Sequence, residues 1–344
     1  MGQGNSLFIS TLRHQYGHRP PVWFMRQAGR VLPKYRELSA QYGFSTLMRD
    51  PDLAARVTLL PVKDLGVDAA ILFSDILVIP MALGVAPVWT PQGPSFPHPL
   101  LAETDPLGKL QENPDALNYI YSAIDKIIQT RQSGTPLIGF CGGPLTILCY
   151  MLQGTSQRGN YNEAIAYCYS HRKETKALIE AVTKITQQYV RQQVAHGIDA
   201  FQLFESYAGE VPAEVYREWF LPAVRQIMQV VMEENVPTIY FGKGLGTGIK
   251  MLTPDCCTYA SVDWQTPLTT ARKLLDPTIG IQGNMDPRLL FSPQPVIEQQ
   301  LKTYLPFFRE HPDWIFSLGY GLINGTPVEN VRFVVDWIKK ETWV

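Results

Sequence analysis

Eight short apolar runs, rich in β-branched and aromatic residues, recur along the 344-residue chain. They are Val22–Met25, Ala70–Phe73, Leu137–Phe140, Ala200–Phe204, Thr238–Phe241, Tyr259–Val262, Ile279–Ile281 and Trp314–Leu318. Helical patterns fill most of the stretches between them: Asp52–Leu65, Ala164–His196, Ala213–Glu234, Pro295–Phe308 and the shorter Pro267–Leu275. Strands that alternate with helices predict an α/β protein whose parallel sheet is covered by helices.

The number of these units favours a (β/α)8 barrel, also called a TIM barrel. The competing architecture, an open doubly wound sheet, usually carries Gly-x-Gly-x-x-Gly after its first strand, and that fingerprint is missing here. The glycine-rich stretch Gly242–Gly248 comes late and has a different spacing, so we interpret it as a strand-to-helix loop. No linker divides the chain, and residues 1–344 are predicted to form a single barrel domain.

A proline-rich segment, Pro80–Pro114, separates the second and third units. Its prolines exclude a long helix, because proline lacks a backbone N–H and clashes with the preceding turn. Since the segment follows the second predicted strand, we interpret it as an insertion that borders the active face. A merely structural excursion explains the sequence equally well.

Composition argues against several classes of partner. The formal net charge is -1, without the basic excess that favours nucleic acid. No apolar run approaches the roughly 20 residues that span a bilayer, so no membrane partner is expected. Five cysteines, an odd number, argue against a disulfide framework and favour a reducing cytoplasm. No Cys-x-x-Cys motif occurs, and we expect no structural zinc site.

Barrels of this kind carry their catalytic groups at the carboxyl ends of the strands. The predicted strand ends carry these residues, in order: Arg26, Gln27, Arg30, Ser74, Asp75, Gly142, Gly143, Tyr150, Glu205, Ser206, Tyr207, Lys243, Asp263, Asn284, Asp286 and Tyr320. The set is rich in cations that bind carboxylates but contains no histidine. Ser206 and Cys141 therefore have no evident histidine base, and no hydrolase nucleophile is predicted.

Two strand ends are especially informative. Arg26 and Arg30 lie four residues apart in a nearly neutral chain, which indicates a local site for an anionic ligand; two solvated arginines at a helix start are the alternative. Asp75 is flanked by apolar residues, so its carboxylate needs a cation or an N–H partner, unless it merely caps the loop. For Glu205 and Asp263 we favour structural roles.

Seven segments carry a resemblance to a known family, in order and at similar spacing. They are Pro21–Pro33, Phe73–Leu77, Gly139–Pro144, Tyr150–Gly154, Gln202–Gly209, Gln282–Pro287 and Thr326–Asn330. These segments resemble the signatures of the uroporphyrinogen decarboxylase family, and the resemblance runs from about residue 20 to the end of the chain.

The resemblance implies a carboxy-lyase of heme and tetrapyrrole biosynthesis that uses no cofactor, forms a single barrel and is usually a homodimer. Its substrate is a cyclic tetrapyrrole with four acetate and four propionate groups, and each acetate becomes a methyl group, which gives coproporphyrinogen. Loss of CO₂ needs an electron sink, which most decarboxylases obtain from a cofactor or metal. A pyrrole can supply its own sink once a ring carbon is protonated, provided that the protein stabilises the resulting cation.

The family's site residues carry over by matched position. Asp75 is expected to hold the pyrrole N–H groups and to stabilise the cationic intermediate. Arg26 and Arg30 are expected to bind substrate carboxylates, and one of them is a candidate proton donor. The other expected substrate-binding residues are Gln27, Ala28 and Gly29 in the same loop, Tyr150, Ser206 and Tyr320; no metal ligand is expected.

The chain departs from the family near its C-terminal end. The family usually reads Asn-Leu-Gly-His-Gly where this chain has Ser317–Gly321, and Asn324 stands where the family usually has proline. Tyr320 replaces the histidine; it can donate a hydrogen bond but cannot be a cation near neutral pH. A tolerated variant and a related activity on a different substrate both fit this change.

Two other functions remain open. A corrinoid-related methyltransferase of the same superfamily would need a zinc site built from His and Cys, for which Cys256 and Cys257 are a poor substitute. A non-catalytic tetrapyrrole-binding protein would bind the substrate without releasing CO₂. Retention of Arg26, Arg30, Asp75 and Tyr150 together argues against that function.

Overall fold

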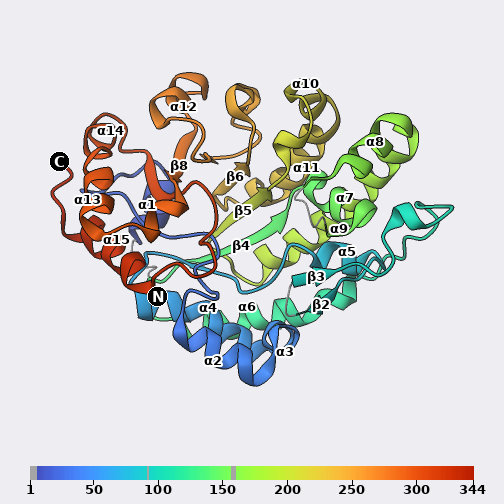
Figure 1. Cartoon of the computed structure of the whole chain (residues 1–344), viewed down its shortest axis with the longest axis horizontal. Helices are drawn as coiled ribbons and strands as arrows, with labels where there is room; N and C mark the ends of the chain where they lie inside the picture. Colours follow the sequence, from blue (N-terminus) through green and yellow to red (C-terminus); the bar gives the residue numbers. More distant parts are fainter. Residues whose placement is uncertain (1–5, 91–92, 156–159) are drawn as a thin grey trace.

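Seven parallel strands form one curled sheet in the order β1-β4-β5-β6-β7-β8-β9 (Figure 1). The computed structural model describes residues 6–90, 93–155 and 160–344. The strands are β1 (Ala70–Ile71), β4 (Leu137–Gly142), β5 (Ala200–Glu205), β6 (Thr238–Gly242), β7 (Tyr259–Ser261), β8 (Gly280–Met285) and β9 (Trp314–Leu318). Because every pair is parallel, all the carboxyl ends lie along one edge of the sheet. The α/β class predicted from the alternating pattern is confirmed.

Helices surround this sheet, and the sequence colours in Figure 1 run round it in order. In α15, Val331, Val334, Val335 and Ile338 are buried at the spacing of one helical face, which packs inward. The helices are α1 (Leu7–Leu12), α2 (Pro33–Tyr42), α3 (Phe44–Arg49), α4 (Pro51–Leu65), α5 (Val78–Ala82), α6 (Asn118–Thr130), α7 (Pro144–Gln153), α8 (Asn162–Ser170), α9 (Arg172–Ala195), α10 (Ala213–Val215), α11 (Leu221–Met232), α12 (Leu268–Leu274), α13 (Gln294–Lys302), α14 (Leu305–Glu310) and α15 (Val328–Lys340).

Three of the longer predicted helices are interrupted: Ala164–His196, Ala213–Glu234 and Pro295–Phe308. The first breaks at His171, between α8 and α9. The second passes through a π-helical turn, Tyr216–Phe220, before α11, and the third divides into α13 and α14. Pro306 lies in the first turn of α14, where the missing N–H leaves no helical bond unmade, and it favours a new helix start. Pro222 directly follows the π-helical turn, where its missing N–H removes one bond of the α-helical pattern while the backbone stays helical.

The first predicted strand, Val22–Met25, is not assigned as a strand. Its pairing with β9 is a single parallel bridge between Val22 and Phe316, in which the Phe316 N–H donates to Pro21 O (2.9 Å). The Trp23 N–H donates only weakly to Phe316 O, at 3.4 Å. Proline at position 21 has no N–H to donate, so a regular ladder cannot extend backwards from this bridge.

Side chains replace the ladder on the other side of this segment, toward β1. The Val22 N–H donates to the Asp68 carboxylate (2.8 Å), and the Asp68 N–H donates to Val22 O (2.8 Å). The Gln27 amide accepts from the Phe24 N–H (3.0 Å) and donates to Ala69 O (2.8 Å). Residues 21–27 therefore lie between β9 and β1, held by these tethers rather than by a continuous strand.

The proline-rich segment folds without a long helix between β1 and α6. It contains the hairpin of β2 (Val88–Thr90) and β3 (Gly93–Ser95) and two 3-10 turns, η1 (Leu100–Ala102) and η2 (Pro114–Leu117); residues 91–92 lie outside the described residues. The Trp89 ring packs on Phe44, with 4.7 Å between ring centroids. This contact holds the hairpin against the start of α3.

Candidate functional site

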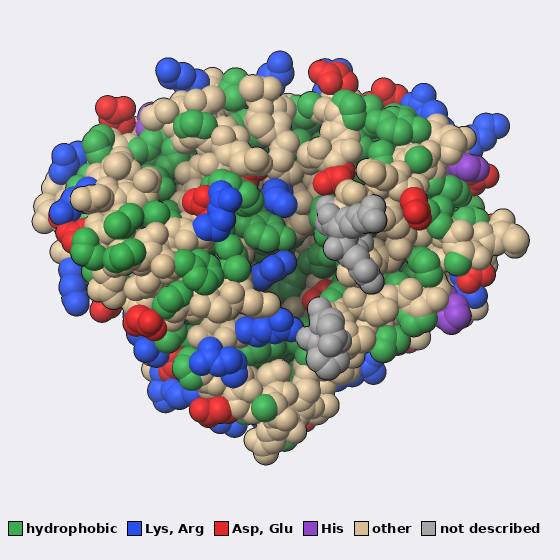
Figure 2. Space-filling model, viewed as in Figure 1, with side chains coloured by type: hydrophobic (Ala, Val, Ile, Leu, Met, Phe, Trp, Pro, Cys, Tyr) green, Lys and Arg blue, Asp and Glu red, His purple; other side chains and the backbone are tan. Residues whose placement is uncertain are grey.

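A cavity of about 470 Å³ opens where the sheet's carboxyl ends meet their following loops. Its lining comes from the loop after Met25, the loop after β1, the β2–β3 hairpin, the ends of β4, β5 and β6, and the loop after β9. Figure 2 shows a hollow near the centre of the face in view, with Lys and Arg side chains beside it. Concave sites at this end of a parallel α/β sheet are typical of ligand binding.

Aromatic side chains form much of the cavity wall. Phe73 packs edge-on against Tyr35 and Phe44, at 5.7 and 5.6 Å between ring centroids. On another side, Phe140 packs against Phe204 at 5.7 Å. Phe44, which also lines the cavity, was not predicted from the sequence, because no signal there connects a residue so far from a strand end with the site. An apolar wall lowers the local dielectric and strengthens any charge interaction inside the cavity.

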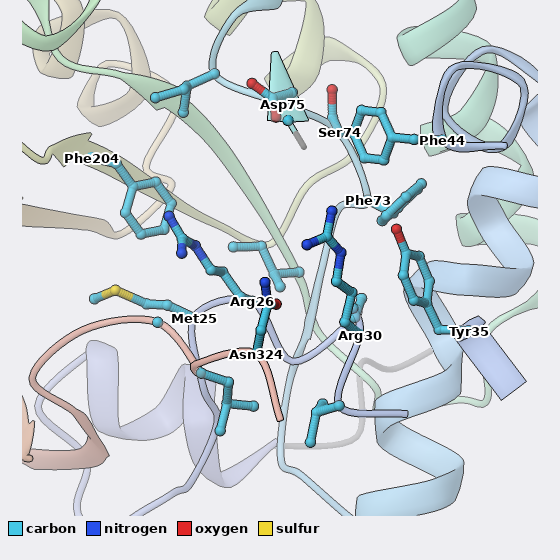
Figure 3. Close-up of a pocket in the computed structure, with 18 of the residues that line it drawn as sticks. Met25, Arg26, Arg30, Tyr35, Phe44, Phe73, Ser74, Asp75, Phe204 and Asn324 are labelled. Carbon is cyan, nitrogen blue, oxygen red and sulfur yellow. The ribbon is translucent and has the colours of Figure 1, made fainter. Parts of the chain in front are cut away.

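The two arginines project from the loop that follows residues 21–25. In Figure 3, Arg30 points toward the side where Ser74 and Asp75 lie, and Arg26 points toward Phe204. Both side chains are exposed, and no carboxylate in the described part of the chain lies within salt-bridge distance of either. Two cations left unpaired at a cavity favour an anionic ligand.

Arg26 has an unusual backbone conformation. Its φ is +63°, in the left-handed region that residues other than glycine rarely adopt. Its side chain crosses Gly321, where a Cβ atom would lie 2.6 Å from Arg26 Cδ. Arg26 Nη2 donates to the Tyr320 hydroxyl (3.3 Å), and the guanidinium carbon lies 5.0 Å from the centre of the Tyr320 ring. The fold therefore accepts local strain to hold this cation at the cavity.

Asp75 lies in the cavity wall with few partners. Oδ1 accepts from the Leu77 N–H (2.9 Å), and no other hydrogen bond reaches this carboxylate within the described residues. Burial raises the pKa of the Asp75 carboxyl to about 6, against the opposing effects of the Leu77 N–H and the Arg26 charge. Beside it, Ser74 Oγ is buried without a hydrogen-bond partner in the same described residues. Asp75 thus retains acceptor capacity for a ligand.

The remaining residues of the arginine loop divide into two groups. Ala28 and Gly29 line the cavity. Gln27 does not: it is fully buried, and its amide is occupied by the Phe24 N–H and Ala69 O. The structure therefore gives the Gln27 side chain a tethering role in the loop.

Ser206 and Tyr320 line the cavity, whereas Tyr150 is not among the residues that line it. The Tyr150 hydroxyl is within hydrogen-bond distance of the Tyr207 hydroxyl (3.0 Å), to which Tyr161 also donates (3.3 Å). Burial raises the pKa of the Tyr150 phenol, so it remains protonated. The two neighbouring tyrosines were not among the residues predicted to bind substrate.

Glu205, at the end of β5, is fully buried and fully engaged. Its carboxylate accepts from the backbone N–H groups of Leu145 (3.2 Å) and Thr146 (2.6 Å), from the Thr146 hydroxyl, and from Tyr216 (3.2 Å). It therefore caps the N-terminus of α7, whose own N-cap residue is Gly143. Burial raises the pKa of the Glu205 carboxyl to about 7 despite these donors. The geometry matches the structural role favoured from the sequence.

Comparison with known proteins extends over almost the whole chain. Residues 3–341 match the family model described as uroporphyrinogen decarboxylase (URO-D). The chain belongs to the uroporphyrinogen decarboxylase family. Among its relatives, a uroporphyrinogen decarboxylase from Pelobacter propionicus is 36% identical over 338 residues and covers 98% of both chains. Another from Christiangramia forsetii is 35% identical over 342 residues, again with 98% of each covered. The resemblance seen in the sequence is confirmed.

Solved structures of lower sequence identity share the fold. A methyltransferase from Methanosarcina mazei superposes with a TM-score of 0.78 at 18% identity, over 96% of this chain and 97% of that one. A B12-independent methionine synthase from Shewanella sp. W3-18-1 gives a TM-score of 0.54 at 13% identity, over 94% and 96%. At these identities the likeness concerns the path of the backbone alone.

Two further observations concern membranes and metals. In the described ranges, no helix is long and apolar enough to cross a bilayer. All five cysteines are buried, and burial raises the pKa of the Cys141 and Cys257 thiols well above their usual value. Protonated, buried thiols are poor ligands for zinc.

Proposed function

We propose that this protein is a uroporphyrinogen decarboxylase, which converts the four acetate side chains of uroporphyrinogen to methyl groups and yields coproporphyrinogen. Family membership supports the reaction class. The observation that carries the proposal is Asp75, a half-buried carboxylate with a single hydrogen-bond donor, in an aromatic-walled cavity beside unpaired Arg26 and Arg30. That combination suits a flat ring with N–H groups at its centre and carboxylates at its edge.

The chemistry follows from the substrate's own ring. A proton adds to a pyrrole carbon, and the ring becomes cationic. The acetate's carbon–carbon bond breaks, CO₂ leaves, and the bonding electrons neutralise the ring. A second proton adds to the exposed methylene carbon while the ring proton is lost. Each cycle thus consumes one proton and turns one acetate into a methyl group with one CO₂. No outside oxidant or reductant is required.

The site residues take complementary roles in this reaction. The ionised Asp75 carboxylate accepts hydrogen bonds from the pyrrole N–H groups and stabilises the ring cation. Arg26 and Arg30 bind carboxylates at the ring edge, with one of them a candidate to deliver the proton. Ser206 and Tyr320 donate hydrogen bonds to further carboxylates. Tyr150 contributes if the substrate displaces Tyr207 from its hydroxyl.

The finer features of the fold and assembly are also proposals. We infer that residues 21–25 take the position of the eighth strand in a single closed (β/α)8 barrel spanning residues 1–344. The Val22 bridge and the hydrogen bond to Asp68 support this. The proline-rich segment is an insertion bordering the active face, supported by the cavity-lining Trp89 and Pro94. A homodimer in the cytoplasm is the assembly that the family resemblance implies.

The test is direct. The purified protein, with no added cofactor, is incubated anaerobically with uroporphyrinogen, and the products are separated by their number of carboxyl groups. We expect stepwise loss from eight carboxyls to four, unchanged by a metal chelator. Release of no CO₂ by a protein that binds the substrate would instead indicate a tetrapyrrole carrier.

A further inference from the structure

Charged and aromatic side chains alternate outward from the cavity, which Arg26 and Tyr320 line, past Lys243 to Trp264 and Arg288, which line a second cavity. Arg26 and Lys243 lie 5.0 and 5.1 Å from the centre of the Tyr320 ring. Lys243 also lies 6.0 Å from the Trp264 ring, and Arg288 lies 5.6 Å from that same ring. These distances are within the range of cation–π attraction. We call these five residues the cation–aromatic row.

The three cations of the row differ in one respect. Arg288 forms a forked salt bridge with Asp286, with Nη2 to Oδ2 at 2.6 Å and Nε to Oδ1 at 2.9 Å. Arg26 and Lys243 have no carboxylate partner within the described ranges. Since both lie close to one ring, they are no more than about 10 Å apart. A bound anion would relieve the repulsion between them.

Lys243 is fixed at its base. Its N–H donates to Glu205 O (3.1 Å), and its carbonyl accepts from the Gly209 N–H (3.0 Å). The next residue, Gly244, donates its N–H to the Asp263 carboxylate (2.6 Å). The half-buried side chain then extends from the end of β6 to the ring of Tyr320, beyond β9. The backbone bonds fix where this side chain begins, and its packing beside two aromatic rings restricts the ammonium more than that of a free surface lysine.

We propose that Lys243 is a further substrate-binding residue, which together with Arg26 on the shared Tyr320 ring holds a peripheral carboxylate of the tetrapyrrole. This inference rests on the proposed decarboxylase function and adds a binding role for a residue at the end of β6. Tyr320 has two tasks: its ring supports both cations, and its hydroxyl remains a donor to the bound carboxylate. The site therefore favours tetrapyrroles with many carboxylates over those with few.

The experiment separates binding from catalysis. Affinity for uroporphyrin, the oxidised ring with eight carboxylates, is measured by quenching of tryptophan fluorescence, and KM and kcat are measured with uroporphyrinogen. In Lys243→Met we expect Kd and KM to rise about tenfold, the value of one charge-assisted hydrogen bond, while kcat changes less than threefold. Lys243→Arg restores most of the affinity, and added salt weakens the wild type more than Lys243→Met.

Matched variants complete the test. Arg288→Met removes a cation from the same row that already has a carboxylate partner, so Kd and KM should change less than twofold. Lys243→Gln serves if Lys243→Met fails to fold, as judged by circular dichroism. Unchanged Kd and KM in a folded Lys243 variant would overturn the inference. If the wild type binds uroporphyrin but releases no CO₂, the proposed function fails and the Kd series alone decides the role of Lys243.

Discussion

Asp75 and Glu205 are two carboxylates that follow or end strands of the same sheet, and desolvation raises the pKa of both, although Glu205 is fully buried and Asp75 half-buried. Glu205 accepts hydrogen bonds from two backbone N–H groups and two hydroxyls, whereas Asp75 accepts one. Since burying a carboxylate is costly, one whose acceptor positions are all filled by the fold serves the structure, and a sparsely bonded one remains available to a ligand. A raised pKa alone therefore does not separate structural from functional acids; the number of filled acceptor positions does.

The largest expected effect comes from Asp75→Asn. The amide cannot stabilise a ring cation, so we expect kcat to fall about 10²–10³-fold, the usual cost of removing a preorganised electrostatic group. The free energy of unfolding should be unchanged or slightly higher, because a buried charge is lost. Anaerobic product analysis and urea unfolding measure the two quantities. Full activity in this variant would remove Asp75 from the mechanism.

Glu205→Gln should give the opposite result. The amide NH₂ faces N–H donors at the start of α7, so the free energy of unfolding should fall by about 1–3 kcal/mol, while kcat changes by less than tenfold. The difference between the free energies of unfolding of the wild type and of Glu205→Gln should be larger at pH 6 than at pH 8. The folded-state pKa of about 7 lies above the unfolded value, so the wild type itself loses roughly 1 kcal/mol of stability between pH 6 and pH 8, as Glu205 ionises in the folded state. A stable but inactive variant would contradict the comparison.

The pH profile tests the same contrast without altering the chain. Because the ionised form of Asp75 is required and its pKa is raised to about 6, kcat/KM should fall below pH 6, by about tenfold at pH 5. Glu205→Gln should keep this acid limb, and Asp75→Asn, at its low residual rate, should lose it. If the acid limb disappears in Glu205→Gln, the group that titrates is Glu205 and not Asp75.

The smallest expected effect is that of Tyr216→Phe. This change removes one of the four donors to Glu205 and the acceptor of the Tyr240 hydroxyl, which donates to Tyr216 at 2.7 Å. We expect a loss of about 1 kcal/mol in the free energy of unfolding, with kcat unaltered. Thermal unfolding and steady-state assays suffice. A loss of activity larger than the loss of stability would connect Glu205 to the chemistry after all.

Strand positions could be read from the sequence because buried parallel strands are short apolar runs, and seven of the eight runs overlap a strand of the sheet. Val22–Met25 has the same composition, but its bonding depends on Asp68 and Gln27, whose roles no local pattern reveals. The break before α14 and the π-helical turn before α11 were missed because apolar periodicity continues across Pro306 and Pro222 while the hydrogen-bond pattern changes.

The candidate site shows a similar limit. Position along the chain brought Arg26, Arg30 and Asp75 to one edge of the sheet, because strand ends converge there. The direction of a side chain is a tertiary property. The buried amide of Gln27 and the hydroxyl pairing of Tyr150 with Tyr207 depend on neighbours far away in sequence. The same holds for Phe44, which reaches the cavity from α3.

The tethers of residues 21–27 have a consequence for how the molecule opens. In a continuous β-ladder, many backbone hydrogen bonds hold two strands together. Here a few side chains do so: Asp68 binds the Val22 N–H, Arg19 and Lys339, and Gln27 binds Ala69. Residues 21–27 should therefore be the first part of the sheet to exchange their amide hydrogens. Because Arg26 and Arg30 lie at the end of this segment, breaking the contacts of Asp68 would displace both cations from the cavity and leave the other residues that line it in place.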